Sequence, residues 1–159
     1  MRELILARHA KSDWGDPRLK DHDRPLNSRG LRDAPRMARY LAEAGAAPER
    51  LLASTALRAR TTAEAYAAQL GLEVELDAQL YMASPSTLLQ KAARTGARSV
   101  MVVAHDPGMS ELAWRLSGGG IDHMPTCAVA RFVFDVDSWA DALGRPADSH
   151  SFAAPKLLA

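Results

Sequence analysis

The chain of 159 residues is predicted to fold as a three-layer α/β/α sandwich with a mostly parallel central sheet. Short apolar runs with strand character alternate with longer stretches of helical character along most of the chain. The run from Ser99 to Ala104 has no polar alternation, as expected of a central strand that helices cover on both faces. A chain of this size buries roughly 68–70% of the surface it exposes when unfolded, so residues 1–159 are expected to form one domain.

Six runs are expected as strands of this sheet. Leu72–Leu76 alternates Leu and Val with Glu, which indicates a strand nearer the sheet edge. Ser149–Ala153 is expected to return as an edge strand. The other four runs are Glu3–Ala7, Arg50–Ala53, Val100–Ala104 and Ala128–Val136.

Helices are expected between these strands, each with start or stop signals. Ser28 is expected to cap a first helix that stops at Gly45 and carries Pro35 in its first turns. Glycines follow the later helices and predict their ends. These later helices are Ala56–Leu70, Ser84–Thr95, Pro107–Ser117 and a short Ser138–Leu143.

Composition limits the classes of partner. Lys and Arg number 20 against 19 Asp and Glu, and the net charge of +1 gives no global attraction to nucleic acid or to an anionic membrane. Cys127 is the single cysteine, so no intrachain disulfide can form. The apolar run before Arg8 is too short for a signal-peptide core or a membrane span, so we expect a cytoplasmic protein.

Three polar segments follow predicted strands, at the edge where open α/β sheets place their ligands. They are Arg8–Ser12, Ser54–Thr61 and His105–Gly108. Taken singly, each has a structural interpretation as a satisfied histidine, a solvated arginine or a helix cap. Three such segments on separate strands of one sheet instead predict a shared site for an anion.

These segments resemble the histidine phosphatase superfamily, which has the phosphoglycerate-mutase-like fold. The resemblance runs from Arg2 almost to the C-terminus, and its ordered motifs are far more specific than Arg-His alone. The superfamily motifs are Arg8-His9-Ala10, Leu57-Arg58-Ala59 with Thr61-Thr62, and Val103–Gly108. Two further segments resemble the SixA-type phosphohistidine phosphatase branch, namely Asp21–Gly30 and Phe152–Leu157.

The resemblance implies a phosphatase in which His9 is the nucleophile and forms a phosphohistidine intermediate. It implies that Arg8, Arg58 and His105 complete the phosphate pocket, and Ser12 is a further candidate for substrate binding at its mouth. Two guanidinium groups can hold phosphate oxygens bidentately, and they oppose the protonation of His9. His105 can stabilise charge on the transferring phosphoryl group. This scheme requires no metal or other cofactor.

The expected proton donor is where the sequence departs from the family. Mutase-like members carry a Glu in the segment after the third strand, and here Gln79 stands at the expected position. An amide cannot act as a general acid. Imidazole leaves phosphorus more readily than an alkoxide does, so we expect the substrate to be phosphohistidine on a partner protein, in signal transduction.

Two alternatives stay open. A phosphomonoesterase of the same superfamily would act on a small phosphate ester, with Asp77 as its acid. A phosphoprotein-binding or phosphate-sensing module with weak activity would not need a nucleophile, so an intact His9 argues against it.

Overall fold

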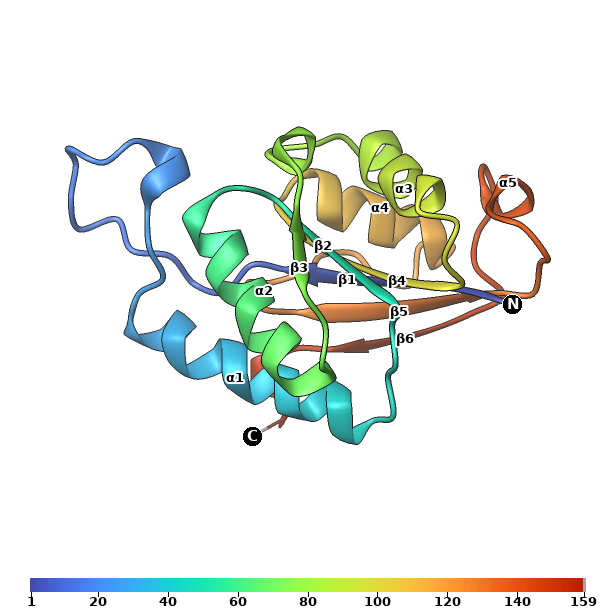
Figure 1. Ribbon diagram of the computed structural model, residues 1–159, viewed down its shortest axis with the longest axis horizontal. Helices are drawn as coiled ribbons and strands as arrows, with labels where there is room; N and C mark the ends of the chain where they lie inside the picture. The colour runs from blue at the N-terminus through green and yellow to red at the C-terminus, as the bar shows by residue number, and fades with distance from the viewer. Residues whose placement is uncertain (159) are drawn as a thin grey trace.

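A computed structural model of the chain, which describes residues 1–158, has a six-stranded sheet between two helical layers (Figure 1). The strands are β1 (Arg2–Arg8), β2 (Arg50–Ala53), β3 (Val74–Leu76), β4 (Ser99–Ala104), β5 (Val129–Phe134) and β6 (Ser149–Ala153). The helices are α1 (Ser28–Glu43), α2 (Leu57–Leu70), α3 (Pro85–Arg94), α4 (Gly108–Leu116) and the short α5 (Trp139–Ala142). Short 3-10 helices are η1 (Asp21–Asp23), η2 (Ala78–Leu80) and η3 (Pro155–Leu158). The predicted α/β/α sandwich is confirmed.

The sheet order is β3-β2-β4-β1-β5-β6. The pairings among β3, β2, β4 and β1 are parallel, and β5 and β6 are added antiparallel. The sheet is therefore mostly parallel, as predicted, and β3 and β6 are its edges. The position of β4 at the centre explains its unbroken apolar run, since both of its faces are covered.

Alternating side chains of the strands feed two separate cores. Leu4 and Leu6 of β1 pack with α3 and α4 on one face, whereas Ile5 and Ala7 pack with α1 and α2 on the other. The same alternation holds in β4 and β2. Figure 1 shows the two helical layers on opposite sides of the sheet. None of the helices within residues 1–158 is long and apolar enough to cross a bilayer.

The helix ends follow the predicted glycine signals, with two corrections in α1. Gly71 ends α2 in the left-handed region, at φ +69°. Asn27 rather than Ser28 caps α1, because its side chain accepts the N–H of Gly30 at 2.9 Å. Pro35 lies inside the helix rather than in its first turns. It is half-exposed, so water can bond to the carbonyl that loses its N–H partner.

Candidate active site

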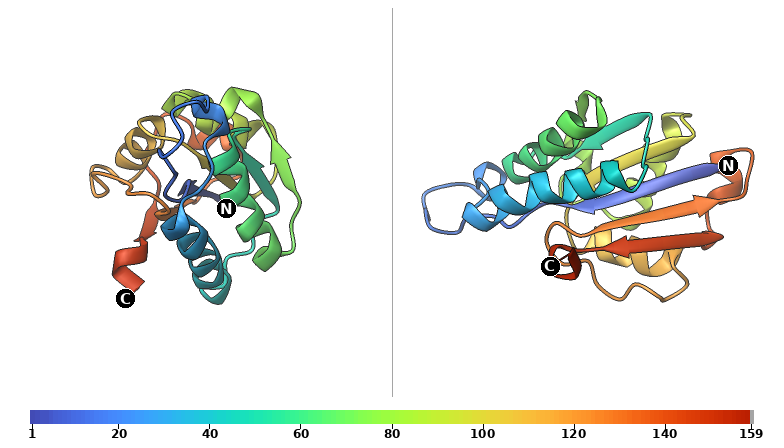
Figure 2. Two further views of the ribbon diagram at one scale, coloured as in Figure 1. Left: turned by 90° about the vertical axis from the view of Figure 1, so that its left-hand side faces the viewer. Right: turned by 90° about the horizontal axis from the view of Figure 1, so that it is seen from below.

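The three polar segments meet at the carboxyl edge of the sheet. The backbone N–H of His9 donates to the carbonyl of Ala104 at 3.1 Å, and that of Ser54 donates to the carbonyl of Val103 at 3.1 Å. The neighbouring order β2-β4-β1 therefore aligns the residues that follow these strands. The loop between β1 and α1 extends beyond the sheet at this end (Figure 2).

A small cavity of about 220 Å³ opens at this edge. All five residues predicted for the site contribute to its wall, namely Arg8, His9, Ser12, Arg58 and His105. The rest of the wall comes from Lys11, Trp14, Asp21, Arg24, Met82, Asp106 and Thr126. Four larger hollows lie elsewhere among residues 1–158, and none of the five predicted residues lines any of them. One of the four is lined by Asp106 and Pro107, which follow His105.

His9 is held as a neutral imidazole with one defined tautomer. Its Nδ1 lies 2.7 Å from the carbonyl oxygen of Ala10. A carbonyl can only accept, so Nδ1 carries the proton and Nε2 keeps its lone pair. The pKa of His9 is lowered to about 4, mainly by burial and also by the positive charges of Arg58 and Arg8, against the opposing bond to Ala10. At neutral pH the ring is therefore ready to act as a nucleophile.

His105 stands beside His9, with the two ring centroids 5.1 Å apart. Its Nε2 lies 2.7 Å from Oγ of Ser54, and that oxygen already accepts the N–H of Ala56 at 3.2 Å. Within residues 1–158, Nε2 is the only hydrogen-bond acceptor for the Ser54 hydroxyl proton. We infer that Ser54 donates to Nε2, which leaves the proton of the neutral ring on Nδ1. The pKa of His105 is lowered to about 3, mainly by burial and also by His9 and Arg58.

Arg8 is positioned at the end of β1 by contacts from two loops. Its Nη1 donates to the carbonyl of Met124 at 2.9 Å and lies 3.4 Å from Oδ2 of Asp106. Asp106 is in turn fixed at the start of α4, where its side chain accepts the N–H and the hydroxyl of Ser110. Arg8 is thus held in place while part of its guanidinium group stays free for a ligand.

Arg58 is almost fully buried, and Asp21 holds it from the loop before α1. Its Nη1 donates to the Asp21 carbonyl at 2.7 Å and its Nη2 to Oδ2 of Asp21 at 2.9 Å. The hydroxyl of Tyr81 also donates to Oδ2. The pKa of Asp21 is lowered to about 2, first by the bond from Tyr81 and then by Arg58, so this carboxylate is ionised at neutral pH.

Three donors in the site are buried without a partner. Among residues 1–158, five buried side-chain polar atoms lack a hydrogen bond, and three of these are Nε of Arg8, Nε of Arg58 and Nδ1 of His105. Buried donors are almost always paired in folded proteins, because leaving one unpaired costs about 1–3 kcal/mol. The three side chains that carry these N–H groups all contribute to the wall of one cavity, and the oxygens of a phosphate are acceptors that such groups can bond.

Arg24 and Trp14 are part of the site that residue spacing does not reveal. Arg24 is buried, its Nη1 donates to Oγ of Ser12 at 3.0 Å, and its guanidinium carbon lies 3.3 Å from the centroid of the exposed Trp14 ring. Arg24 also contributes to the lowered pKa of His9, after burial and the two other arginines. The hydroxyl of Ser12 accepts this bond and keeps its own proton for a ligand, consistent with its predicted place in the wall.

The segment after β3 differs from the sequence-based expectation. Gln79 is exposed and is not part of the cavity wall, whereas Met82 is. Gln79 lies on η2, which turns the chain so that the residue three positions later faces the site. The thioether of Met82 cannot donate a proton, so Met82 cannot act as a general acid any more than Gln79 could. Tyr81 lies beside the site as well, with its ring edge-on to His105 at 5.4 Å between centroids.

Asp77 lies outside this cavity. It accepts the N–H of Gln79 at 2.9 Å and forms an ion pair of 2.9 Å with Lys91. Lys91 lowers the pKa of Asp77, which keeps the carboxyl ionised. Within residues 1–158, no group of three or more His, Cys, Asp and Glu side chains is arranged to hold a metal ion.

Several known proteins share this fold and sequence. Residues 4–81 match the family model of the histidine phosphatase superfamily (branch 1). An uncharacterized chloroplastic protein of Arabidopsis thaliana is 32% identical over 154 residues, which cover 89% of this chain and 70% of that protein. An uncharacterized protein of Mycobacterium leprae is 37% identical over 123 residues, or 73% of this chain and 74% of that protein.

Solved structures extend the match to nearly the whole chain. A protein of Agrobacterium tumefaciens with the provisional name phosphohistidine phosphatase SixA is 29% identical, with a TM-score of 0.81 over 97% of this chain and 98% of that one. A protein of Nakamurella with the same provisional name is 26% identical, with a TM-score of 0.85 over 97% and 96% of the two chains. The ordered motifs, the sheet order and these matches agree, and the chain belongs to the histidine phosphatase superfamily, in its SixA-type branch.

Proposed function

We propose that this protein is a metal-independent phosphatase in which Nε2 of His9 accepts the phosphoryl group. The observation that carries this proposal is the state of His9. Its proton is held on Nδ1 by the Ala10 carbonyl, and His9 lines a cavity together with three side chains that each carry a buried N–H group without a partner. A neutral nucleophile beside an anion site is the arrangement that phosphoryl transfer requires.

In the first step, Nε2 attacks phosphorus and the bond from phosphorus to the leaving group breaks. Nε of Arg8, Nε of Arg58 and Nδ1 of His105 donate to the phosphoryl oxygens while charge shifts among them. In the second step, water attacks phosphorus, the bond to Nε2 breaks, and inorganic phosphate leaves. His9 is then neutral again with its proton still on Nδ1. The arginines supply the positive charge in both steps, so no metal takes part.

The leaving group is proposed to be the imidazole of a phosphohistidine on another protein. The two carboxyl groups in the wall already accept bonds, Asp21 from Arg58 and Tyr81, and Asp106 from Ser110. Neither carboxyl group of the wall is therefore free to protonate an alkoxide, whereas an imidazole can take its proton from water. Similar structures named SixA support this substrate class, including one of a protein histidine phosphatase complexed with tungstate, an oxyanion of phosphate shape.

The test compares leaving groups at equal enzyme concentration. We expect a purified phosphohistidine protein to be hydrolysed at least about a hundredfold more efficiently, in kcat/KM, than 3-phosphoglycerate or p-nitrophenyl phosphate. Faster hydrolysis of the esters would overturn the substrate assignment and leave the nucleophile intact. Binding of the phosphoprotein without turnover would instead support a sensing module.

A further inference from the structure

Helix α1 carries four arginines on one face. They are Arg29, Arg32, Arg36 and Arg39. At 100° per residue their positions fall within an arc of about 80°. The opposite face is buried against the sheet through Met37, Ala38 and Leu41. The arginines thus form one stripe, here called the arginine stripe, along the side of α1 away from the core.

The positive charge of this stripe is only partly balanced. Asp33 is buried beneath it and lies 3.5 Å from Nε of Arg29 and 3.9 Å from Nε of Arg32. No carboxylate of residues 1–158 lies within 4.0 Å of Arg36 or Arg39. The net charge of the whole chain is only +1, so this excess is a local feature of α1.

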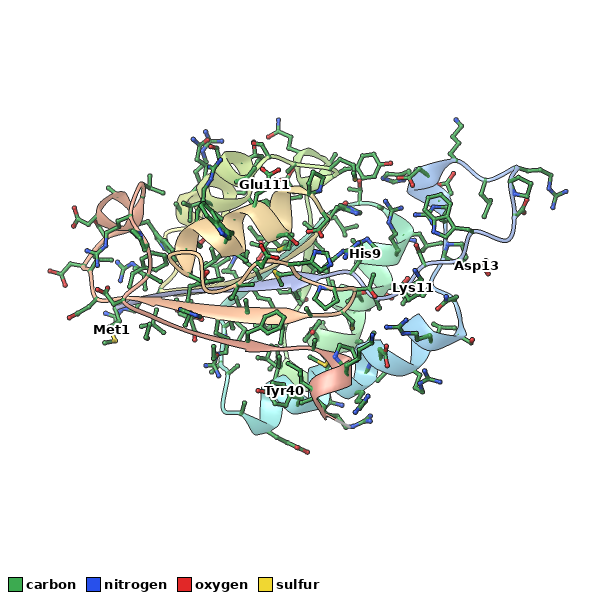
Figure 3. The ribbon with its side chains drawn as sticks, turned by 180° about the vertical axis from the view of Figure 1, so that it is seen from behind. Met1, His9, Lys11, Asp13, Tyr40 and Glu111 are labelled. Atoms are coloured by element: carbon green, nitrogen blue, oxygen red, sulfur yellow. The ribbon has the colours of Figure 1, made fainter. Side chains whose placement is uncertain are left out.

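The arginine stripe begins at the rim of the active-site cavity. The N–H of Asn27 donates to the carbonyl of Lys11 at 3.0 Å, and Lys11 belongs to the cavity wall. At Gly30, a Cβ atom would lie 2.2 Å from that same carbonyl, so the close contact requires a glycine. Figure 3 shows His9 and Lys11 at this end of the molecule, next to the first turn of α1. From there the stripe runs about 15 Å along the helix, from Arg29 to Arg39.

We propose that the arginine stripe docks an acidic surface of the protein that carries the phosphohistidine. This inference rests on the proposed function and names the chemistry of its partner. A phosphorylated side chain that enters the cavity places the surface around it over the rim, where the stripe begins. Carboxylates flanking the phosphohistidine would then face Arg36 and Arg39, which raises the rate of encounter and disfavours basic partners.

The experiment uses two synthetic helical peptides with the same phosphohistidine. One carries glutamates at positions 3, 7 and 10 from it, and the other carries glutamines there. We expect kcat/KM for the acidic peptide to exceed that for the neutral one about tenfold at low salt, through KM. The ratio should approach one in 0.5 M NaCl, where screening is strong.

Matched variants assign this preference to the stripe. Arg36→Gln with Arg39→Gln should abolish the preference and leave turnover of free phosphoramidate within about twofold. The control is Arg94→Gln with Arg115→Gln, two exposed arginines on the helices of the opposite face, which should retain the preference.

The possible outcomes separate the two proposals. Equal turnover of both peptides by the parent protein, or a preference that survives loss of Arg36 and Arg39, overturns the docking surface alone. No turnover of either peptide, with phosphoramidate still hydrolysed, overturns the proposed substrate and the docking surface with it. A loss of binding to phosphatidylserine vesicles in the stripe variant, with peptide preference unchanged, would assign the stripe to a membrane surface and overturn the proposal.

Discussion

Two charged clusters of the molecule, one beside the edge strand β3 and one in the active-site cavity, differ in whether all their donors have partners. In the cluster beside β3, two cations each have a carboxylate: Arg50 bonds Glu75 at 2.5 Å and Lys91 bonds Asp77 at 2.9 Å. In the active-site cavity Arg8 and Arg58 also have carboxylates, at 3.4 and 2.9 Å. Their Nε–H groups and Nδ1 of His105 are nevertheless buried with no partner. The first cluster is complete within the chain, whereas the second is complete only with an anion.

This difference separates a structural role from a chemical one. A cluster of paired charges near the surface contributes little to the free energy of unfolding, and its groups stay charged at neutral pH. Buried N–H groups without a partner lower the stability of the fold, and folded proteins retain such groups where function requires them. Asp77 belongs to the paired cluster, which is the physical reason against its use as an acid. Four variants or conditions test this contrast, from the largest expected effect to the smallest.

The largest expected effect is on the pH dependence of the free energy of unfolding, because the active site buries two imidazoles. The neutral forms of His9 and His105 are favoured by burial, with pKa values of about 4 and about 3 against 6.5 in the unfolded chain. The unfolded chain therefore binds more protons as the pH falls below 6.5, and the folded state loses about 2–3 kcal/mol for each ring between pH 7 and 4.5. Lowered carboxylate pKa values of Asp77 and Glu75 give losses only below about pH 4.5.

Urea unfolding at pH 7.0 and 4.5 measures this loss. His9→Asn should lose less stability over the same interval than the parent, because one buried imidazole is gone. Equal losses of stability in the parent and the variant would show that protonation of the buried His9 imidazole is not the cause.

Arginine-to-lysine changes compare the two clusters directly. Arg58→Lys keeps the charge but removes the Nε–H and the planar fork, so we expect kcat/KM to fall about a hundredfold. Arg50→Lys makes the same change in the paired cluster and should leave kcat/KM within about twofold. Steady-state kinetics on one phosphohistidine protein measures both variants. Similar losses of kcat/KM in the two would contradict the different roles of the two clusters.

Ser54 is a positioning residue for His105. Ser54→Ala removes the hydroxyl that fixes the proton on Nδ1, and we expect kcat to fall about tenfold with little change in KM. Ser54→Thr keeps a hydroxyl and should restore most of the rate. Nitrogen NMR of the imidazoles supplies the second readout: in the parent, His105 should be the Nδ1–H tautomer, and a mixture of tautomers is expected in the alanine variant. A single Nδ1–H tautomer of His105 in the alanine variant would contradict the role of Ser54.

Asp77→Asn should have the smallest effect. The partly exposed ion pair with Lys91 is worth about 1 kcal/mol, and the carboxyl is outside the cavity, so turnover of any phosphate compound should change less than about twofold. Rates on p-nitrophenyl phosphate and on phosphohistidine measure this. A loss specific to the ester would restore Asp77 as an acid.

The parts of this structure that local sequence determines could be predicted. Apolar runs and glycine stops predict β1, β2, β4 and the ends of the helices, and the parallel order of three strands brings His9, Arg58 and His105 together. The N-cap of α1 is Asn27, one residue before the expected Ser28, because both residue types are equally good caps.

Long-range loop contacts could not be predicted in the same way. Asp21, Arg24 and Tyr81 meet the site because the loop before α1 and the turn after β3 fold back over the sheet edge. No periodicity fixes such turns. The short helix η2 is the clearest case, because it exchanges Gln79 for Met82 at the cavity.

The most direct measurement is to trap the phosphoryl group on the protein. The protein is mixed with a labelled phosphoramidate, quenched in base and digested, and the label is mapped by mass spectrometry and assigned by phosphorus NMR. We expect one label, on Nε2 of His9, and no label or turnover in His9→Ala. A label on Nδ1 would contradict the tautomer set by Ala10, and absence of label with unchanged turnover in His9→Ala would contradict the mechanism as a whole.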